Sequence, residues 1–181
     1  IESESSVLVQ DEKGKKTKYQ TKNIVISTGS IPSSLPNVKI DEKNIVSSTG
    51  ALSFDSVPKD LVIIGGGYIG LEMASVWKRL GSNVTVIEFL DLIIPEMDTD
   101  ISTEFLKILK KQEINFRLNS EVTSVRTVKD KLVVDFTNNS SSERIRMEAD
   151  KVLVAIGRKP FVEGLNLTKM GIKIDKNSRI Q

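Results

Sequence analysis

The stretch DLVIIGGGYIGLEMASVWKRLGSNVTVIE, residues 60–88, decides the fold. Residues 61–64 form a short apolar run that ends in three glycines, which is typical of a strand buried on both faces of a parallel sheet. Small or apolar residues then recur at the helical spacing i, i+3, i+4 and i+7, at Gly70, Met73, Ala74 and Trp77. Gly81 supplies a C-terminal stop. Because residues 84–88 (VTVIE) again form a strand pattern, the whole stretch predicts a βαβ unit.

The turn between the first strand and the helix carries the pattern G-x-G-x-x-G as Gly65, Gly67 and Gly70. Gly65 allows the sharp turn, Gly67 has no side chain to hold the backbone away from a pyrophosphate, and Gly70 lets the helix lie close to the strand. The helix N-terminus then offers free N–H groups and a positive dipole end to phosphates. The alternative is a glycine-rich strand–helix turn without a ligand. The complete βαβ context favours the dinucleotide site.

Glu88 closes the second strand, about twenty residues after the glycines, as the fingerprint requires. A carboxylate there can accept hydrogen bonds from both hydroxyls of an adenosine ribose and would repel a 2′-phosphate. No basic residue follows Glu88 before Lys107. The sequence therefore predicts NAD rather than NADP, and the alternative is a solvated glutamate at a strand end.

Downstream residues complete an α/β fold. A second helix is predicted after a cap within residues 98–100, with apolar positions Ile101, Phe105, Ile108 and Leu109. A third strand at 114–118 follows, and then three alternating segments that predict an antiparallel meander, at 120–128, 131–137 and 143–149. A last buried strand ends at Gly157. We expect a three-layer, Rossmann-type domain over residues 31–157, with a parallel sheet and a three-stranded meander.

The ending of this domain has a counterpart near the start of the chain. KNIVISTGSIP, residues 22–32, matches DKVLVAIGRKP, residues 150–160, in kind at almost every step. Both stretches predict a buried strand, then a glycine, then a proline three residues later. Hairpin strands at 7–10 and 16–20 precede the first copy, but no glycine fingerprint does. We expect residues 1–30 and 158–181 to be edges of another dinucleotide-binding domain, and the chain to be part of a longer protein.

Composition excludes several kinds of site. The chain has 181 residues, a net charge of +2, no cysteine and no histidine. Thiol, disulfide and imidazole chemistry and the usual zinc sites are therefore absent from these residues, and we expect no metal site. The small net charge predicts no nucleic-acid partner. No stretch approaches the ~20 apolar residues of a membrane helix, so no membrane span is predicted.

The chain resembles the flavoprotein disulfide reductases that use pyridine nucleotides, and within that family the dihydrolipoamide dehydrogenases. The resemblance covers essentially the whole chain. It lies in STGS, SSTGAL, the long βαβ stretch, LKKQEINFRLNSEV and IGRKPF, at residues 27–30, 47–52, 57–88, 109–122 and 156–161. Ser27 stands where alanine is common in the family, and Lys159 where arginine is common.

The resemblance implies roles for individual residues. Residues 65–72, which are Gly65, Gly66, Gly67, Tyr68, Ile69, Gly70, Leu71 and Glu72, would line the NAD pyrophosphate and the approach to the nicotinamide. Glu88 would bind the adenosine ribose, Val122 would touch the adenine side, and Gly157 would lie under the cofactor. Thr28, Gly29 and Ser30 would lie beside the FAD, and residues 1–30 and 158–181 would be the edges of the FAD domain.

Two of these roles have structural alternatives. Tyr68 would cover the flavin face and move for the nicotinamide, or it is an aromatic residue that packs at a helix start. Glu72 would meet the nicotinamide carboxamide, or it is a first-turn glutamate that favours the helix dipole.

The resemblance also implies an activity, partners and a location. The whole enzyme would reoxidise dihydrolipoyl groups of 2-oxoacid dehydrogenase or glycine-cleavage complexes, passing electrons through a dithiol and FAD to NAD. The dithiol and a His–Glu pair would lie outside these residues, so the chain alone would be inactive. A homodimer is expected, in the cytoplasm of a bacterium or the mitochondrial matrix of a eukaryote. The alternatives are another NADH-dependent disulfide reductase or NADH oxidase, and a plain NAD-binding module.

Overall fold

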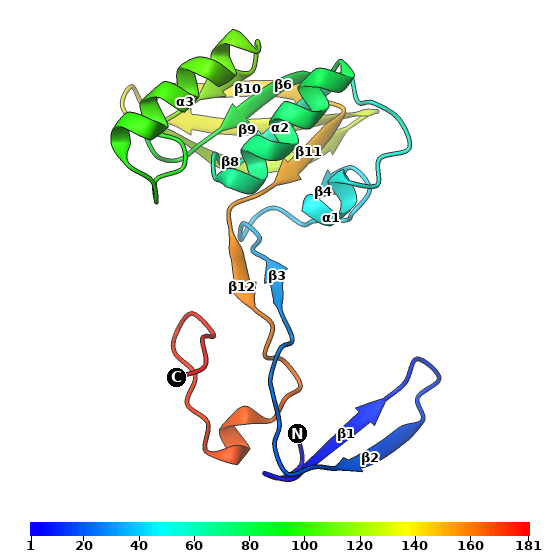
Figure 1. The fold of residues 1–181 in the computed structure, drawn as a ribbon. Coiled ribbons are helices and arrows are strands. Elements are labelled where there is room, and N and C mark those ends of the chain that lie inside the picture. The colour runs from blue at the N-terminus through cyan, green and yellow to red at the C-terminus, as the bar shows by residue number, and fades with distance from the viewer. The chain divides into compact units, whose positions relative to one another are not determined.

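The structure, a computed structural model, describes all 181 residues and divides them into two compact units. Unit 1 consists of Ile1–Ile31 and Arg158–Gln181, and unit 2 of Pro32–Gly157. Figure 1 shows the elements of each unit. The assignment of unit 1 to an FAD domain stays a prediction.

A five-stranded parallel sheet forms the centre of unit 2. Its strands, in spatial order, are β4 (Ile45–Val46), β11 (Lys151–Val154), β5 (Asp60–Ile64), β6 (Asn83–Ile87) and β7 (Asn115–Arg117). Strands β5, β6 and β11 are buried along most of their length, as their continuous apolar runs predict.

Helices cover one face of this sheet (Figure 1). They are α1 (Ser48–Ala51), α2 (Tyr68–Leu80) and α3 (Thr99–Lys111). Leu71, Ala74 and Trp77 of α2 pack against alternate residues of the strands, including Leu61 and Ile63 of β5. Helix α2 ends at Gly81, and α3 is capped by the Asp98 side chain, both as predicted.

A three-stranded antiparallel meander covers the other face. It consists of β8 (Ser120–Val128), β9 (Lys131–Asn138) and β10 (Arg144–Ala149). Leu132, Val134 and Phe136 of β9 pack against Val62 and Ile64 of β5. Since the two sides of β5 face different layers, unit 2 has three layers, and the predicted α/β fold class is confirmed.

Unit 1 contains a two-stranded hairpin, a second pair of short strands and a short 3₁₀ helix. Strands β1 (Ser6–Gln10) and β2 (Lys16–Gln20) form the predicted hairpin. The other elements are β3 (Ser30–Pro32), β12 (Arg158–Pro160), which pairs with β3, and the 3₁₀ helix η1 (Leu167–Met170).

The prediction of a buried strand before Gly29, within residues 22–32, was wrong. Residues 23–29 have no strand conformation, and the Val25 side chain is 86% exposed. The apolar pattern alone does not make a strand, because a strand also needs a neighbouring backbone for its hydrogen bonds, and no strand of this chain pairs with these residues. No helix of the chain has the length and apolar character needed to cross a membrane.

Candidate dinucleotide site

The candidate site lies where three parallel strands end at the same edge of the sheet. The N–H of Gly65 donates to the carbonyl of Ile87 at 2.9 Å, and the N–H of Ala155 donates to the carbonyl of Ile64 at 2.8 Å. The structure thus brings together the glycine turn after β5, Glu88 after β6 and the residues after β11. Ligands of open α/β sheets bind at this carboxyl edge.

Two of the three fingerprint glycines are required by the fold itself. Gly65 has a φ of +111°, and a Cβ there would lie 2.4 Å from the carbonyl oxygen of Ala155. A Cβ on Gly70 would lie 2.2 Å from the carbonyl oxygen of Gly65. Both contacts are to backbone atoms that cannot turn aside. These glycines therefore allow the tight turn and the close approach of α2 to β5.

Gly67 is different, because nothing in the chain requires glycine at this position. Its backbone has φ −77° and ψ 175°, which other residues adopt readily. A Cβ added to Gly67 would have no atom within 4 Å. The space in front of Gly67 is open, so a side chain there would obstruct only something that comes from outside the chain.

The start of α2 presents unpaired donors to this open space. The N-cap of α2 is Gly67, which has no side chain to cap the helix. The backbone N–H groups of Tyr68, Ile69 and Gly70 have no acceptor in the chain. Together with the positive end of the helix dipole, three free N–H groups make a site suited to a phosphate.

Glu88 lies directly beside the glycine turn. Its Oε2 accepts a hydrogen bond from the N–H of Gly66 at 2.5 Å, and its Oε1 accepts one from the N–H of Leu90 at 2.9 Å. The side chain is half-buried. A carboxylate oxygen can accept more than one hydrogen bond, so these contacts leave acceptor capacity for ribose hydroxyls.

A loop that the sequence analysis did not include supports the turn from outside. The N–H of Ile94 donates to the carbonyl of Gly66 at 2.9 Å, and the neighbouring Ile93 side chain is fully buried. Ile94 has a φ of +41°, an unusual conformation for a β-branched residue. The sequence has no signal for this contact, because isoleucine does not favour positive φ.

The remaining predicted residues of α2 occupy different environments. Tyr68 is 63% exposed, and Glu72 is exposed as the fifth residue of the helix, beyond the first turn. Ile69 is half-buried. Leu71 is buried in the core, so only its backbone could line a ligand. Tyr68 is thus mostly exposed, and Glu72 lies beyond the first turn of α2, while the cofactor roles of both residues stay predictions.

Val122 and Gly157 lie beside the same edge. Val122, near the start of β8, packs partly against the core between the meander and the sheet. Gly157 has a φ of +120°, and its carbonyl accepts the N–H of Ser33 at 2.9 Å. Gly157 therefore ends the last strand in a conformation that favours glycine.

Thr28, Gly29 and Ser30 belong to unit 1, where they contact the segment that follows β11. The Thr28 hydroxyl donates to the carbonyl of Phe161 at 2.5 Å, and the N–H of Phe161 donates to the carbonyl of Gly29 at 3.0 Å. The guanidinium of Arg158 donates to the Ser30 hydroxyl at 2.8 Å. Their predicted contact with FAD stays a prediction. No group of three His, Cys, Asp or Glu side chains is placed to hold a metal ion.

Comparison with known proteins shows to which family the chain belongs. The family model for pyridine nucleotide-disulphide oxidoreductases matches residues 1–181. The chain belongs to this family. Membership implies flavin and nicotinamide cofactors, and the fit of the glycine turn and Glu88 to a dinucleotide agrees with it.

Several curated relatives are about half identical to the chain. A leghemoglobin reductase of Glycine max is 49% identical over 178 residues, which cover 98% of this chain and 34% of the relative. A mitochondrial dihydrolipoyl dehydrogenase of Pisum sativum is also 49% identical, over 98% of this chain and 36% of the relative. The chain therefore spans about a third of the length of these relatives.

A solved structure supports the fold. The copper complex of an HOCl-induced flavoprotein disulfide reductase from Escherichia coli superposes with a TM-score of 0.88 at 29% sequence identity. The superposition covers 100% of this chain and 40% of that chain.

Proposed function

We propose that unit 2 binds NAD(H) at the carboxyl edge of its parallel sheet. The observation that carries this proposal is Gly67, a fingerprint glycine that the fold does not require and that faces open space. A bound pyrophosphate would explain this glycine, because the pyrophosphate would occupy the space in which any side chain at position 67 would lie. The free N–H groups of Tyr68, Ile69 and Gly70 would donate to its oxygens.

Glu88 would select NAD(H) over NADP(H). Its carboxylate is held in place by the N–H groups of Gly66 and Leu90, so it would present a fixed negative charge to the adenosine ribose. The ribose hydroxyls would donate to it, whereas a 2′-phosphate would be repelled. Tyr68 and Glu72, both exposed at the start of α2, would lie toward the nicotinamide side.

For the whole protein we propose the activity of a dihydrolipoyl dehydrogenase. The support is the 49% identity to a relative of that name from Pisum sativum and to a dihydrolipoamide dehydrogenase from Chaetomium thermophilum. When bound, the nicotinamide would accept a hydride from a flavin. The FAD would lie with Thr28, Gly29 and Ser30, in the domain to which unit 1 contributes. The redox dithiol and the His–Glu pair must lie elsewhere, since these 181 residues contain neither cysteine nor histidine.

The partners and location follow from the same proposal. The protein would serve 2-oxoacid dehydrogenase or glycine-cleavage complexes and act as a homodimer. Relatives named as mitochondrial come from plants and a yeast, and another relative is bacterial, from Pseudomonas putida. The location would accordingly be the mitochondrial matrix in a eukaryote and the cytoplasm in a bacterium.

A second candidate is another NADH-dependent disulfide reductase. It is favoured by the high structural similarity to the Escherichia coli flavoprotein disulfide reductase, whose identity to this chain is only 29%. Both candidates share the proposed NAD(H) site, and they differ in the substrate that exchanges electrons with the redox disulfide of the whole protein.

The test is a fluorescence titration of the 181-residue chain with NADH and, separately, with NADPH. We expect saturable NADH binding in the micromolar to millimolar range, with NADPH weaker by about tenfold or more, because Glu88 would lose its ribose hydrogen bonds and face a phosphate. The same chain should give no turnover with dihydrolipoamide. Equal binding of the two nucleotides would contradict the role of Glu88, and turnover would contradict the need for a dithiol, which these residues lack.

A further inference from the structure

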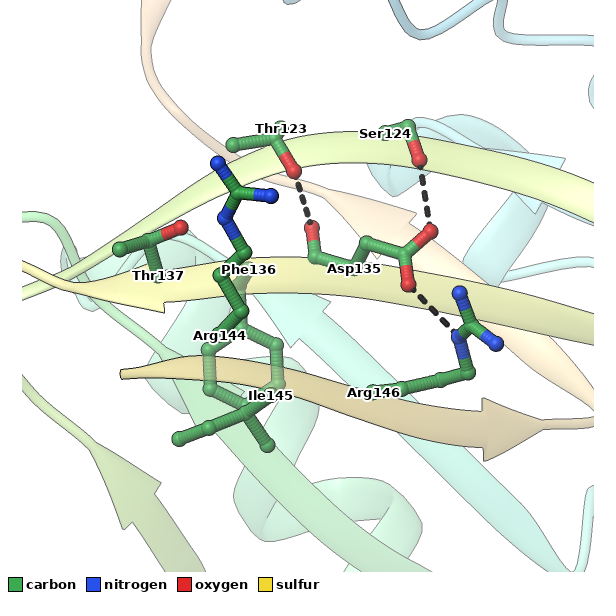
Figure 2. A pocket seen from close by; sticks show the side chains of 8 residues that line it. All are labelled: Thr123, Ser124, Asp135, Phe136, Thr137, Arg144, Ile145 and Arg146. Atoms are coloured by element: carbon green, nitrogen blue, oxygen red, sulfur yellow. Dashed lines mark hydrogen bonds and ion pairs between the residues drawn. The ribbon is translucent and has the colours of Figure 1, made fainter. Parts of the chain in front are cut away.

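The outer face of the meander carries a pocket of about 550 Å³ that shares no residue with the dinucleotide site. Its lining comes from β8, β9 and β10, as Figure 2 shows. Asp135 and Arg144 project from one side of these strands, and Phe136 and Ile145 project from the other side toward the core (Figure 2). The volume lies within the range of small-molecule sites, about 300–1,000 Å³.

Arginine side chains outnumber carboxylates in the lining of this pocket. The single acidic lining residue is Asp135, and its carboxylate is already shared by two arginines. Nε of Arg146 lies 2.9 Å from Oδ1 of Asp135, and Arg126 contacts Oδ2. The Ser124 hydroxyl donates to Oδ2 at 3.0 Å. Asp135 therefore has no free capacity to neutralise a further cation.

Arg144 has no such partner. It takes part in none of the ion pairs of the chain, and its side chain makes no hydrogen bond. Its cross-strand neighbour on β9 is Thr137, whose hydroxyl is also without a partner. Glu121, which lies opposite Thr137 on β8, does not line the pocket. A guanidinium and a hydroxyl thus remain available side by side.

An irregularity of β8 shapes the pocket. The register of β8 against β9 shifts between Val122 and Ser124, so Thr123 is an extra residue in the strand. The Thr123 hydroxyl donates to the carbonyl of Asp135 at 3.1 Å and lines the pocket. Bulges of this kind redirect side chains and often occur beside functional sites.

We propose that this pocket binds a small ligand with a phosphate or carboxylate group, with the Arg144 guanidinium and the Thr137 hydroxyl as its donors. A guanidinium forms two parallel hydrogen bonds to either group, which makes arginine the side chain best suited to such oxyanions. Arg146 adds positive charge at the same rim, while its Nε remains bonded to Asp135.

The experiment uses the ¹⁵N-labelled 181-residue chain and follows its backbone amides by NMR. The probes are sodium phosphate and sodium acetate, each compared with sodium chloride at equal ionic strength. We expect at least one of the two oxyanions to shift the amides of Thr137, Arg144 and Ile145 saturably, with a dissociation constant in the millimolar range. Which of them acts assigns the ligand to the phosphate or the carboxylate class. Shifts at Tyr68–Gly70 would report the separate dinucleotide site.

Two arginine variants complete the test. Arg144→Gln should weaken the binding about tenfold, as expected for the loss of charge-assisted hydrogen bonds, while the rest of the spectrum stays unchanged. Arg79→Gln, at an exposed position in the last turn of α2, should bind as the unsubstituted chain does. Shifts that are no larger than those in sodium chloride, or equal binding by Arg144→Gln and Arg79→Gln, would overturn the proposal.

Discussion

The carboxylate of Glu88 and the backbone N–H of Gly66 are joined by a hydrogen bond of 2.5 Å. This contact ties the end of β6 to the glycine turn after β5, across 22 residues of sequence. The residue that would choose the nucleotide is therefore held by the same turn that would hold the pyrophosphate.

Replacing Glu88 should change the choice of nucleotide. Glu88→Arg removes the acceptor for the ribose hydroxyls and adds a cation suited to a 2′-phosphate. We expect NADH to bind about ten- to a hundredfold more weakly and NADPH more tightly, measured by fluorescence titration. Glu104→Arg is the control, because Glu104 lies on the exposed side of α3 and makes only a surface ion pair with Lys107. If both nucleotides respond to Glu88→Arg in the same way, Glu88 is not the ribose ligand.

Replacing Gly67 should affect binding without affecting the fold. Gly67→Val adds a side chain where the chain has no atom within 4 Å of the added Cβ, at a backbone conformation open to other residues. We expect a far-UV circular dichroism spectrum like that of the unsubstituted chain and a loss of NADH binding. Normal NADH binding by a folded Gly67→Val chain would mean that no ligand approaches this turn.

Replacing Gly70 should have the opposite effect. A Cβ on Gly70 would lie 2.2 Å from the carbonyl oxygen of Gly65, so α2 must move away from β5. Overpacking of this kind costs about 1–3 kcal/mol, and we expect Gly70→Ala to lower the midpoint of urea unfolding accordingly. Gly67→Ala is the matched control and should unfold close to the unsubstituted chain. Equal midpoints for the two variants would contradict the close approach of α2.

The sequence predicted the βαβ unit because its signals are local. The apolar run of β5, the helical spacing of α2 and the stop at Gly81 each depend on residues near one another, and all three are present in the structure. The meander was predicted for the same reason. The distinction among the glycines could not be predicted, because the pattern does not show which of them contacts backbone atoms of another strand.

The parts that were missed depend on contacts distant in sequence. Residues 23–29 have the composition of a buried strand but have no pairing partner in this chain. Strand β4 has only two residues, and its place beside β11 follows from pairing rather than from pattern. The hydrogen bond from Ile94 to Gly66 needs an unusual backbone conformation that no residue preference indicates.

The ion-pair cluster on the meander should give the stability of the chain a defined pH dependence. The hydrogen bond from Arg146, followed by those from Ser124 and Arg126, lowers the pKa of Asp135 from 3.8 to about 2. A lowered pKa means that the ionised form is stabilised in the folded state. That stabilisation is complete above the pKa of the unfolded state, about 3.9, and is lost as the pH falls toward 2.

We therefore expect the difference in unfolding free energy between the unsubstituted chain and Asp135→Asn to shrink as the pH is lowered from 5 to 2. Urea unfolding at several pH values measures it. Asp130→Asn, in the β8–β9 turn, is the control, because Asp130 makes no ion pair. A difference for Asp135→Asn that stays constant over this range would show that the ion pairs do not stabilise the fold.

The central claim is that the start of α2 and Glu88 together form an NAD(H) site, and amide NMR of the ¹⁵N-labelled 181-residue chain tests it most directly. On addition of NADH, the amides of Tyr68, Ile69 and Gly70 should shift saturably, because their free N–H groups would gain acceptors. The amides of Gly66 and Leu90, which are bonded to Glu88, should shift with the same dissociation constant. In Gly67→Val these shifts should disappear. Saturable NADH binding that leaves these five amides unmoved, or no saturable binding by the folded chain, would contradict the account.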